Sequence, residues 1–183
     1  GSLEWFRQIR AYRYGYETPF IPRLFDFDGL QGKRVLEIGV GLGIDAVEMA
    51  SRGAIYTGLD ITRNHLELTR RNFELNLPDY QPRLVEGDLL EADLQEEFDV
   101  VYSFGVLHHI QHERDYLRRI HELLSDAGTL RIALYSKFSF FNAWMIATWM
   151  GRQFGRTSLA DWQSHVAEHS ELIRAGIDIV QPD

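Results

Sequence analysis

The feature that most constrains the fold of this 183-residue chain is the alternation of short apolar runs with segments of helical periodicity. Five apolar runs are predicted to be strands, at residues 33–38, 55–59, 83–86, 98–103 and 129–135. Helical spacing is found at residues 44–52, at 63–76 after a predicted Thr62 cap, and at 112–124, with Gly128 marking the end of the last helix. Such alternation gives βαβ units with right-handed crossovers. The sequence therefore predicts a doubly wound α/β fold with a mostly parallel sheet.

The chain is predicted to be a single domain over residues 1–183, with a core at residues 33–135. Residues 1–28 are aromatic and are expected to form a helical cap or lid, and residues 138–183 a helical region on the substrate side. Residues 177–180 are the one candidate for a further strand after the core.

Composition excludes some classes of protein. The formal net charge is −8, and Arg7, Arg10 and Arg13 are interpreted as solvated helix faces, so nucleic acid is not expected as a partner. The chain has no cysteine, which excludes disulfides and thiolate chemistry. It also lacks the roughly 18–20 uninterrupted apolar residues of a membrane span. A cytoplasmic location is the default expectation, and the oligomeric state is left open.

A glycine-rich turn follows the first predicted strand, in the segment Glu37-Ile38-Gly39-Val40-Gly41-Leu42-Gly43. Glycines there let the backbone approach a ligand closely, because no Cβ intervenes. A dinucleotide fingerprint has glycines at offsets 0, 2 and 5, whereas these fall at 0, 2 and 4. The carboxylate of Glu37 suits a cationic ligand better than a diphosphate. Both features disfavour a nicotinamide-dependent oxidoreductase.

Two aspartates follow the next two predicted strands. Asp60 is placed to accept hydrogen bonds from both hydroxyls of a ribose, and Asp88 from an exocyclic adenine amine. Carboxyl ends of parallel strands meet at one edge of a sheet, so these side chains and the glycine turn are expected to line one crevice. The alternative is that Asp60 and Asp88 only cap turns, as aspartate commonly does.

Four motifs in this order resemble the class I S-adenosylmethionine-dependent methyltransferases. They are the glycine turn at 37–43, Gly-Leu-Asp-Ile-Thr at 58–62, Glu-Gly-Asp-Leu-Leu at 86–90, and Phe-Asp-Val-Val-Tyr-Ser-Phe-Gly-Val-Leu-His-His-Ile at 98–110. The likeness covers about residues 33–135 and is greatest to the small-molecule subgroup with a His-His pair after the fourth strand.

The resemblance implies a set of cofactor contacts. The methionine part of S-adenosylmethionine would be surrounded by Glu37, Gly39, Gly41 and Gly43; ribose and adenine would be held by Asp60, Ile61, Asp88 and Leu89; and Ser103, Phe104 and Gly105 would lie beside the sulfonium. The family usually ends with two further strands, one of them antiparallel. Since this chain offers at most one, we expect either that the sequence is truncated or that the closing antiparallel strand is missing.

Candidate catalytic residues follow the fourth and fifth predicted strands. His108 is the first candidate for a general base, because an imidazole titrates near neutral pH; Tyr135 and His109 are weaker candidates. The alternative is that the His-His pair only lines the site or caps a helix. The i, i+4 pairs His108/His112 and His165/His169 could share a helix face, but no third ligand accompanies them, so no functional metal is expected.

The aromatic N-terminal segment has two interpretations. It either packs on the sheet or closes over the crevice as a lid, in which case Tyr12 and Tyr16 would contact the cofactor. The predicted function is transfer of a methyl group from S-adenosylmethionine to a small-molecule acceptor, with S-adenosylhomocysteine as product. The alternative is a non-catalytic module that binds the cofactor or a partner.

Overall fold

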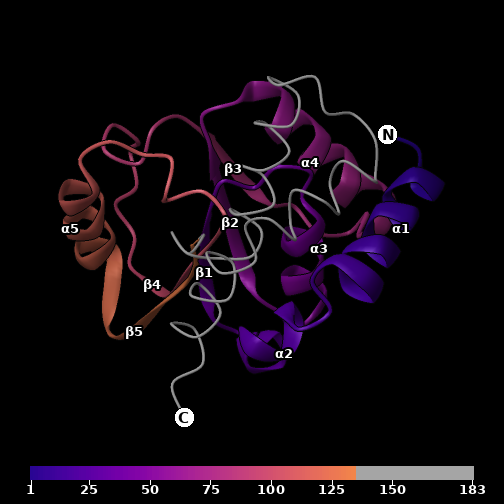
Figure 1. Cartoon of the computed structure of the whole chain (residues 1–183), viewed down its shortest axis with the longest axis horizontal. Helices are drawn as coiled ribbons and strands as arrows, with labels where there is room; N and C mark the ends of the chain where they lie inside the picture. The colour runs from indigo at the N-terminus through magenta and orange to yellow at the C-terminus, as the bar shows by residue number, and fades with distance from the viewer. Residues whose placement is uncertain (135–183) are drawn as a thin grey trace, which may run out of the picture. The chain divides into compact units, whose positions relative to one another are not determined.

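A computed structural model describes residues 1–134 of the protein (Figure 1). Four short helices precede the sheet: α1 (Leu3–Tyr12), the π-helix η1 (Arg13–Glu17), α2 (Ile21–Leu24) and the 3-10 helix η2 (Phe27–Leu30). The elements that follow are β1 (Arg34–Ile38), α3 (Ile44–Ser51), β2 (Ile55–Asp60), α4 (Arg63–Asn76), β3 (Arg83–Glu86), β4 (Phe98–Phe104), α5 (Glu113–Leu123) and β5 (Leu124–Ala133). Tyr135, the 138–183 region and the candidate strand at 177–180 lie outside the described residues.

The five strands form one sheet in the order β3-β2-β1-β4-β5, and all pairs are parallel. The chain runs outward from β1 through β2 to β3, and then returns to add β4 and β5 on the other side of β1. The strand order therefore reverses between β1 and β4, which is where open α/β sheets bind their ligands. The predicted doubly wound α/β fold is confirmed for the described residues.

Alternate side chains of the central strands enter two different cores. Val35 of β1 packs with residues of α3 and α4, including Met49 and Phe73. Its neighbour Leu36 packs on the opposite face, where Ile120 of α5 is also buried. A large apolar side chain contributes about 1.5–3 kcal/mol when it is fully buried. The two-faced pattern explains why α3 and α4 cover one face and α5 the other, as Figure 1 shows.

The segment before β1 covers part of the α3 face. The rings of Phe25 and Phe27 meet the Tyr102 ring edge-on, at centroid distances of 5.3 and 5.6 Å. Phe6 of α1 is also buried. Packing on the sheet is therefore the outcome for Phe25 and Phe27.

One strand boundary was predicted wrongly. β5 begins at Leu124 rather than at residue 129, because Leu124 already pairs with Phe98 before the register shifts to Val100 and Thr129. Gly128 lies in this irregularity, where a Cβ would be 2.9 Å from the carbonyl oxygen of Phe98. This glycine therefore serves a close approach within the sheet, and α5 ends earlier, at Leu123.

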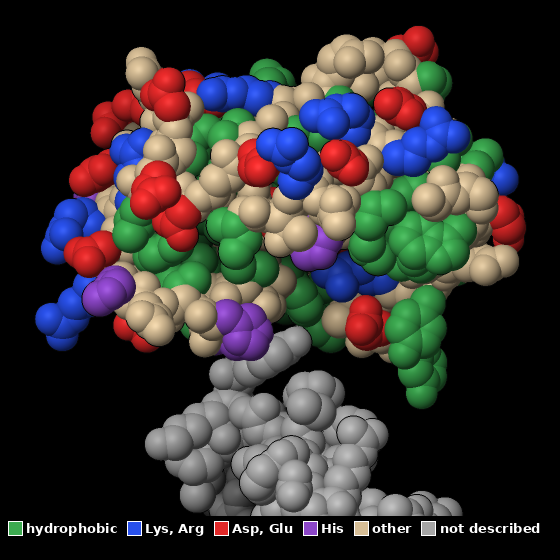
Figure 2. Space-filling view, turned by 90° about the horizontal axis from the view of Figure 1, so that it is seen from above, with side chains coloured by type: hydrophobic (Ala, Val, Ile, Leu, Met, Phe, Trp, Pro, Cys, Tyr) green, Lys and Arg blue, Asp and Glu red, His purple; other side chains and the backbone are tan. Residues whose placement is uncertain are grey.

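The surface of the described part is mixed in charge. On the face that Figure 2 shows, Lys and Arg side chains are interspersed with Asp and Glu, and hydrophobic side chains are exposed among them. No helix within residues 1–134 is long and apolar enough to span a membrane. The cytoplasmic location and the absence of a nucleic-acid partner stay predictions.

Candidate functional site

The predicted site residues of the core lie at the carboxyl edge, the edge of the sheet at which all five parallel strands end. Residues 39–43 leave β1 there, Asp60 ends β2, Asp88 follows β3, and Phe104 ends β4. The loop from Gly105 to His112 also starts at this edge and contains His108. The fold thus brings together segments that are far apart in the sequence.

The glycine loop, residues 39–43, has a backbone that side-chain-bearing residues rarely adopt. Gly41 has a φ of +53° and Gly43 a φ of +69°. Their surroundings differ: a Cβ on Gly43 would be 2.8 Å from the side chain of Thr69, whereas a Cβ on Gly41 would meet nothing within 4 Å. Gly43 therefore allows the loop to pack on α4, and Gly41 leaves an open side at which a ligand can reach the backbone.

Two residues of α4 that the sequence analysis missed hold this loop. The buried Asn72 donates from Nδ2 to the carbonyl oxygens of Leu42 at 3.2 Å and Gly43 at 3.0 Å. Thr69 donates from Oγ1 to the Gly41 carbonyl at 3.4 Å. Buried amides and hydroxyls on a helix are a weak signal in the sequence, because most such residues face water.

Asp60 joins the end of β2 to the glycine loop. Its carboxylate accepts from the backbone N–H of Gly41 at 3.2 Å and of Thr62 at 2.8 Å, and it lies 3.2 Å from Nδ1 of His65. Thr62 stands at the N-cap position of α4, but its side chain makes no cap hydrogen bond. Ile61, next to Asp60, is 72% exposed. An exposed apolar side chain beside a buried carboxylate suits a ligand with a sugar and a flat ring.

Asp88 is engaged by the protein itself. Its Oδ1 accepts from the N–H of Leu90 at 2.8 Å, and its Oδ2 accepts from the hydroxyl of Tyr116 on α5. Burial and then the Asp88 hydrogen bond raise the pKa of Tyr116 to about 12. Leu89 is buried in the α5-side core. Asp88 therefore caps a turn, as Asp60 does through the N–H of Thr62, and an adenine contact from Asp88 and Leu89 stays a prediction.

The end of β4 supplies buried and half-buried groups. Ser103 is buried and donates to the carbonyl of Ile38 at 3.0 Å, so its hydroxyl ties β4 to β1. The N–H of Gly105 donates to the carbonyl of Ala133 at 3.0 Å. The rings of His108 and His109 lie 3.9 Å apart between centroids. Burial and the neighbouring His109 lower the pKa of His108.

The suggested metal pair His108/His112 does not share a helix, because α5 begins at Glu113 and His112 has a left-handed φ of +64°. No group of three potential metal ligands occurs within residues 1–134.

Glu37 lies buried at the end of β1 and accepts a hydrogen bond from the hydroxyl of Tyr56 at 2.5 Å. Burial and the nearby carboxylate of Asp45 raise the pKa of Glu37 well above its ordinary value, against the hydrogen bond from Tyr56 and the charge of Arg13. A cation that binds beside Glu37 would favour its ionised form, against the burial and the Asp45 charge that raise its pKa.

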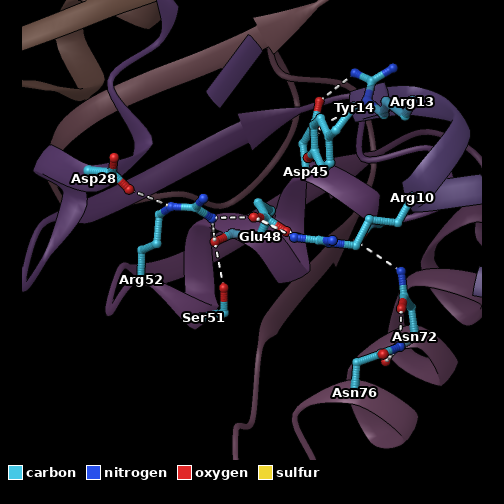
Figure 3. Close-up of polar contacts among 11 residues, drawn as sticks. Arg10, Arg13, Tyr14, Asp28, Asp45, Glu48, Ser51, Arg52, Asn72 and Asn76 are labelled. Carbon is cyan, nitrogen blue, oxygen red and sulfur yellow. Dashed lines mark hydrogen bonds and ion pairs between the residues drawn. The ribbon is translucent and has the colours of Figure 1, made fainter. Parts of the chain in front are cut away.

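The interpretation as a solvated helix face was wrong for Arg13, whose side chain is only 19% exposed, whereas the side chain of Arg10 is 54% exposed. Both pair with α3 through two N–H groups: Arg10 with Glu48 at 2.6 and 2.8 Å, and Arg13 with Asp45 at 2.8 and 2.5 Å (Figure 3). The sequence does contain a signal, since Arg10 and Arg13 have the same three-residue spacing as Asp45 and Glu48. That spacing puts each pair on one face of a helix.

The two N-terminal tyrosines of the predicted site are on the surface. Tyr12 is 56% exposed and Tyr16 is 78% exposed, with ring centroids 5.5 Å apart. The ion pairs of Arg10 and Arg13 attach this part of the chain to α3. The exposed side chains of Tyr12 and Tyr16 are therefore what stays of the predicted lid. A contact between either tyrosine and a cofactor stays a prediction.

Taken with the open glycine loop, this fold is that of a class I S-adenosylmethionine-dependent methyltransferase domain. A family model described as "Methyltransferase domain" matches residues 6–175, and the chain belongs to that family. Membership decides against the nicotinamide-dependent alternative.

Curated relatives and a solved structure agree with this assignment. The chain is 31% identical over 192 aligned positions to the ubiquinone biosynthesis O-methyltransferase of Cereibacter sphaeroides, covering 98% of this chain and 76% of the relative. It is 34% identical over 114 residues to the protein of the same name from Glaesserella parasuis, covering 60% of this chain and 48% of that one. A Mesorhizobium loti S-adenosylmethionine-dependent methyltransferase structure superposes with a TM-score of 0.51 at 28% identity, covering 56% of this chain and 46% of its own. The chain thus spans about half the length of several relatives that it matches.

Proposed function

We propose that the protein binds S-adenosylmethionine at the carboxyl edge and transfers its methyl group to a small-molecule acceptor, leaving S-adenosylhomocysteine. The observation that carries the proposal is the glycine loop at the point where the strand order reverses. Its open side at Gly41 adjoins Asp60, whose carboxylate accepts from the Gly41 N–H at 3.2 Å. Backbone accessible beside a buried carboxylate is what a nucleoside-containing ligand requires.

The residues at this edge match the chemical groups of S-adenosylmethionine. Asp60 retains acceptor capacity on Oδ1 for a ribose hydroxyl, since a carboxylate offers about four lone-pair sites. A ligand can replace His65 as the contact of Oδ2, because the His65 side chain is 45% exposed and can move into solvent. Ile61 offers an apolar surface to the adenine. Glu37, at the end of β1, would become ionised beside the ammonium or sulfonium group, because a nearby cation opposes the burial that raises its pKa.

The chemistry needs little from the protein beyond positioning. When bound, S-adenosylmethionine supplies an electrophilic methyl carbon, whose bond to sulfur breaks as a lone pair of the acceptor forms the new bond. The glycine loop and Asp60 would fix the direction of attack. His108 would accept the proton of a hydroxyl acceptor, since its lowered pKa keeps the imidazole neutral at pH 7. Ser103, Phe104 and Gly105 stay candidates for the residues beside the sulfonium, and Tyr135 stays a candidate catalytic residue.

The acceptor class is proposed from the names of the relatives. Two of them are called O-methyltransferases, so an oxygen nucleophile is the first class to test. A phenolic compound such as catechol is a suitable small probe, because its hydroxyl can lose a proton to His108.

The proposed function is tested by calorimetry followed by turnover. S-adenosylmethionine is titrated into the full chain, with NAD as the competitor, and formation of S-adenosylhomocysteine is then measured with a panel of small hydroxyl acceptors. Binding that NAD does not displace, with turnover on an acceptor, supports the proposal. Binding without turnover on any acceptor supports the non-catalytic module, and no binding at all removes the site.

A further inference from the structure

The N-terminal arm, residues 3–17, is fastened to α3 by two arginine–carboxylate pairs of unequal burial (Figure 3). The outer pair, Arg10 with Glu48, has an arginine side chain that is 54% exposed. The inner pair, Arg13 with Asp45, has an arginine that is only 19% exposed, and its carboxylate is buried. Screening by water weakens the outer pair more than the inner one.

The inner pair is directly connected to the proposed cofactor site. Asp45 lies in the first turn of α3, immediately after the glycine loop. Its carboxylate also accepts from the hydroxyls of Tyr14 at 2.6 Å and Tyr102 at 2.8 Å. The guanidinium of Arg13 lies 5.0 Å from the centroid of the Phe104 ring, at the end of β4. One side chain of the arm thus contacts two elements that border the carboxyl edge.

Several charged or titratable groups from different elements surround Glu37. The carboxylates of Asp45 on α3 and Asp60 on β2 act to raise its pKa, and Arg13 on η1 acts to lower it. The fold places these groups next to one another: Glu37 on β1 is the register partner of Tyr102 on β4, whose hydroxyl donates to Asp45, and Tyr56 on β2 donates to Glu37. Among these groups Arg13 is the cation, so removing it leaves carboxylates that repel one another.

We propose that Arg13 is a positioning residue for the cofactor: by pairing with Asp45 it compensates the charge beside Glu37 and keeps the Glu37 carboxylate able to hold a cationic ligand. The inference rests on the proposed function, because it assigns the cation to S-adenosylmethionine. On this proposal the N-terminal arm contributes to cofactor binding in addition to covering the sheet. Arg10, one turn away on the same arm, serves attachment only.

The test measures S-adenosylmethionine affinity by calorimetry between about pH 6 and 9 for the full chain and four variants. In Arg13→Gln the pKa of Glu37 should rise further, because the lowering effect of the Arg13 charge is lost, so the midpoint of the pH dependence of binding should move to higher pH. The affinity should recover as the pH is raised. Asp45→Asn removes a repelling charge and should shift the midpoint of the pH dependence the other way, to lower pH. Arg13→Lys retains the charge and should restore most of the profile.

Arg10→Gln is the matched control. It removes an arginine–carboxylate pair of the same arm and should lower the melting temperature without moving the pH midpoint. The proposal is overturned if folded Arg13→Gln has the wild-type midpoint, or if Asp45→Asn shifts in the same direction as Arg13→Gln. Since Asp45→Asn gives an independent result, the test does not depend on Arg13→Gln folding. If the wild type does not bind S-adenosylmethionine at all, the proposed function fails instead.

Discussion

Valine substitutions at Gly41 and Gly32 distinguish the effect of backbone strain on stability from the loss of cofactor binding. Gly41 has a φ of +53° and Gly32 a φ of +72°, and a Cβ on either residue would meet no atom within 4 Å. Each valine variant therefore incurs strain without a clash, at about 1–3 kcal/mol. Gly32 precedes β1 at the opposite end of the strand from the glycine loop, so Gly32→Val is a matched control for folding.

The expected result is a difference in the response to cofactor. At a concentration about 100 times the Kd, a ligand stabilises the native state by about 2.7 kcal/mol. For a chain of about 150–250 residues this raises the melting temperature by roughly 5–11 °C. The wild type and Gly32→Val should show this rise with S-adenosylmethionine. Gly41→Val should show none, because its side chain occupies the open side of the loop.

Thermal melts with and without S-adenosylmethionine provide the measurement, and calorimetry checks the affinity. Gly43→Ala adds a further comparison: its Cβ would be 2.8 Å from Thr69, so it should lose more stability than the φ strain alone explains. The reasoning is refuted if folded Gly41→Val responds to the cofactor as strongly as Gly32→Val does.

Three further predictions concern single groups. Asp60→Asn should reduce cofactor affinity by at least about tenfold, since hydrogen bonds to a charged group contribute about 1.5–3 kcal/mol. It should also lower the melting temperature, because Asp60 supports the glycine loop. Unchanged affinity in calorimetry would remove Asp60 from the site. His108→Gln should lower kcat about 100-fold with unchanged cofactor Kd, whereas His109→Gln should have little effect. The neutral imidazole is the active form and the pKa of His108 is lowered, so wild-type kcat should fall only at a pH below that at which an ordinary imidazole titrates. Equal effects of the two variants would contradict a base role for His108. Hydrogen exchange should slow on residues 15–20 when S-adenosylmethionine binds and stay constant on residues 5–14, where Arg10 and Arg13 attach the chain to α3. No change at residues 15–20 would withdraw the lid, and with it both tyrosines, from the site.

Most of the fold was predictable because its signals are local. The strand ends at Ile38, Asp60 and Glu86 follow from short apolar runs bounded by glycine or acidic residues. Parallel pairing then places those ends at one edge, so the candidate cofactor residues come together without any knowledge of side-chain contacts. The start of β5 was missed because the early pairing of Leu124 with Phe98 depends on a register shift that no local pattern encodes.

The sequence by itself determined the α/β class, the position of the glycine loop and the acidic residues that follow the strands, since each depends on residue type and spacing along the chain. Only the tertiary structure decided which polar groups pair. Arg13 meets Asp45, Asn72 holds the glycine loop, and Tyr116 engages Asp88 across separations of 28 to 32 residues. Such pairings arise because burial makes unpaired polar groups costly. Which partner satisfies each group is set by how the helices pack on the sheet.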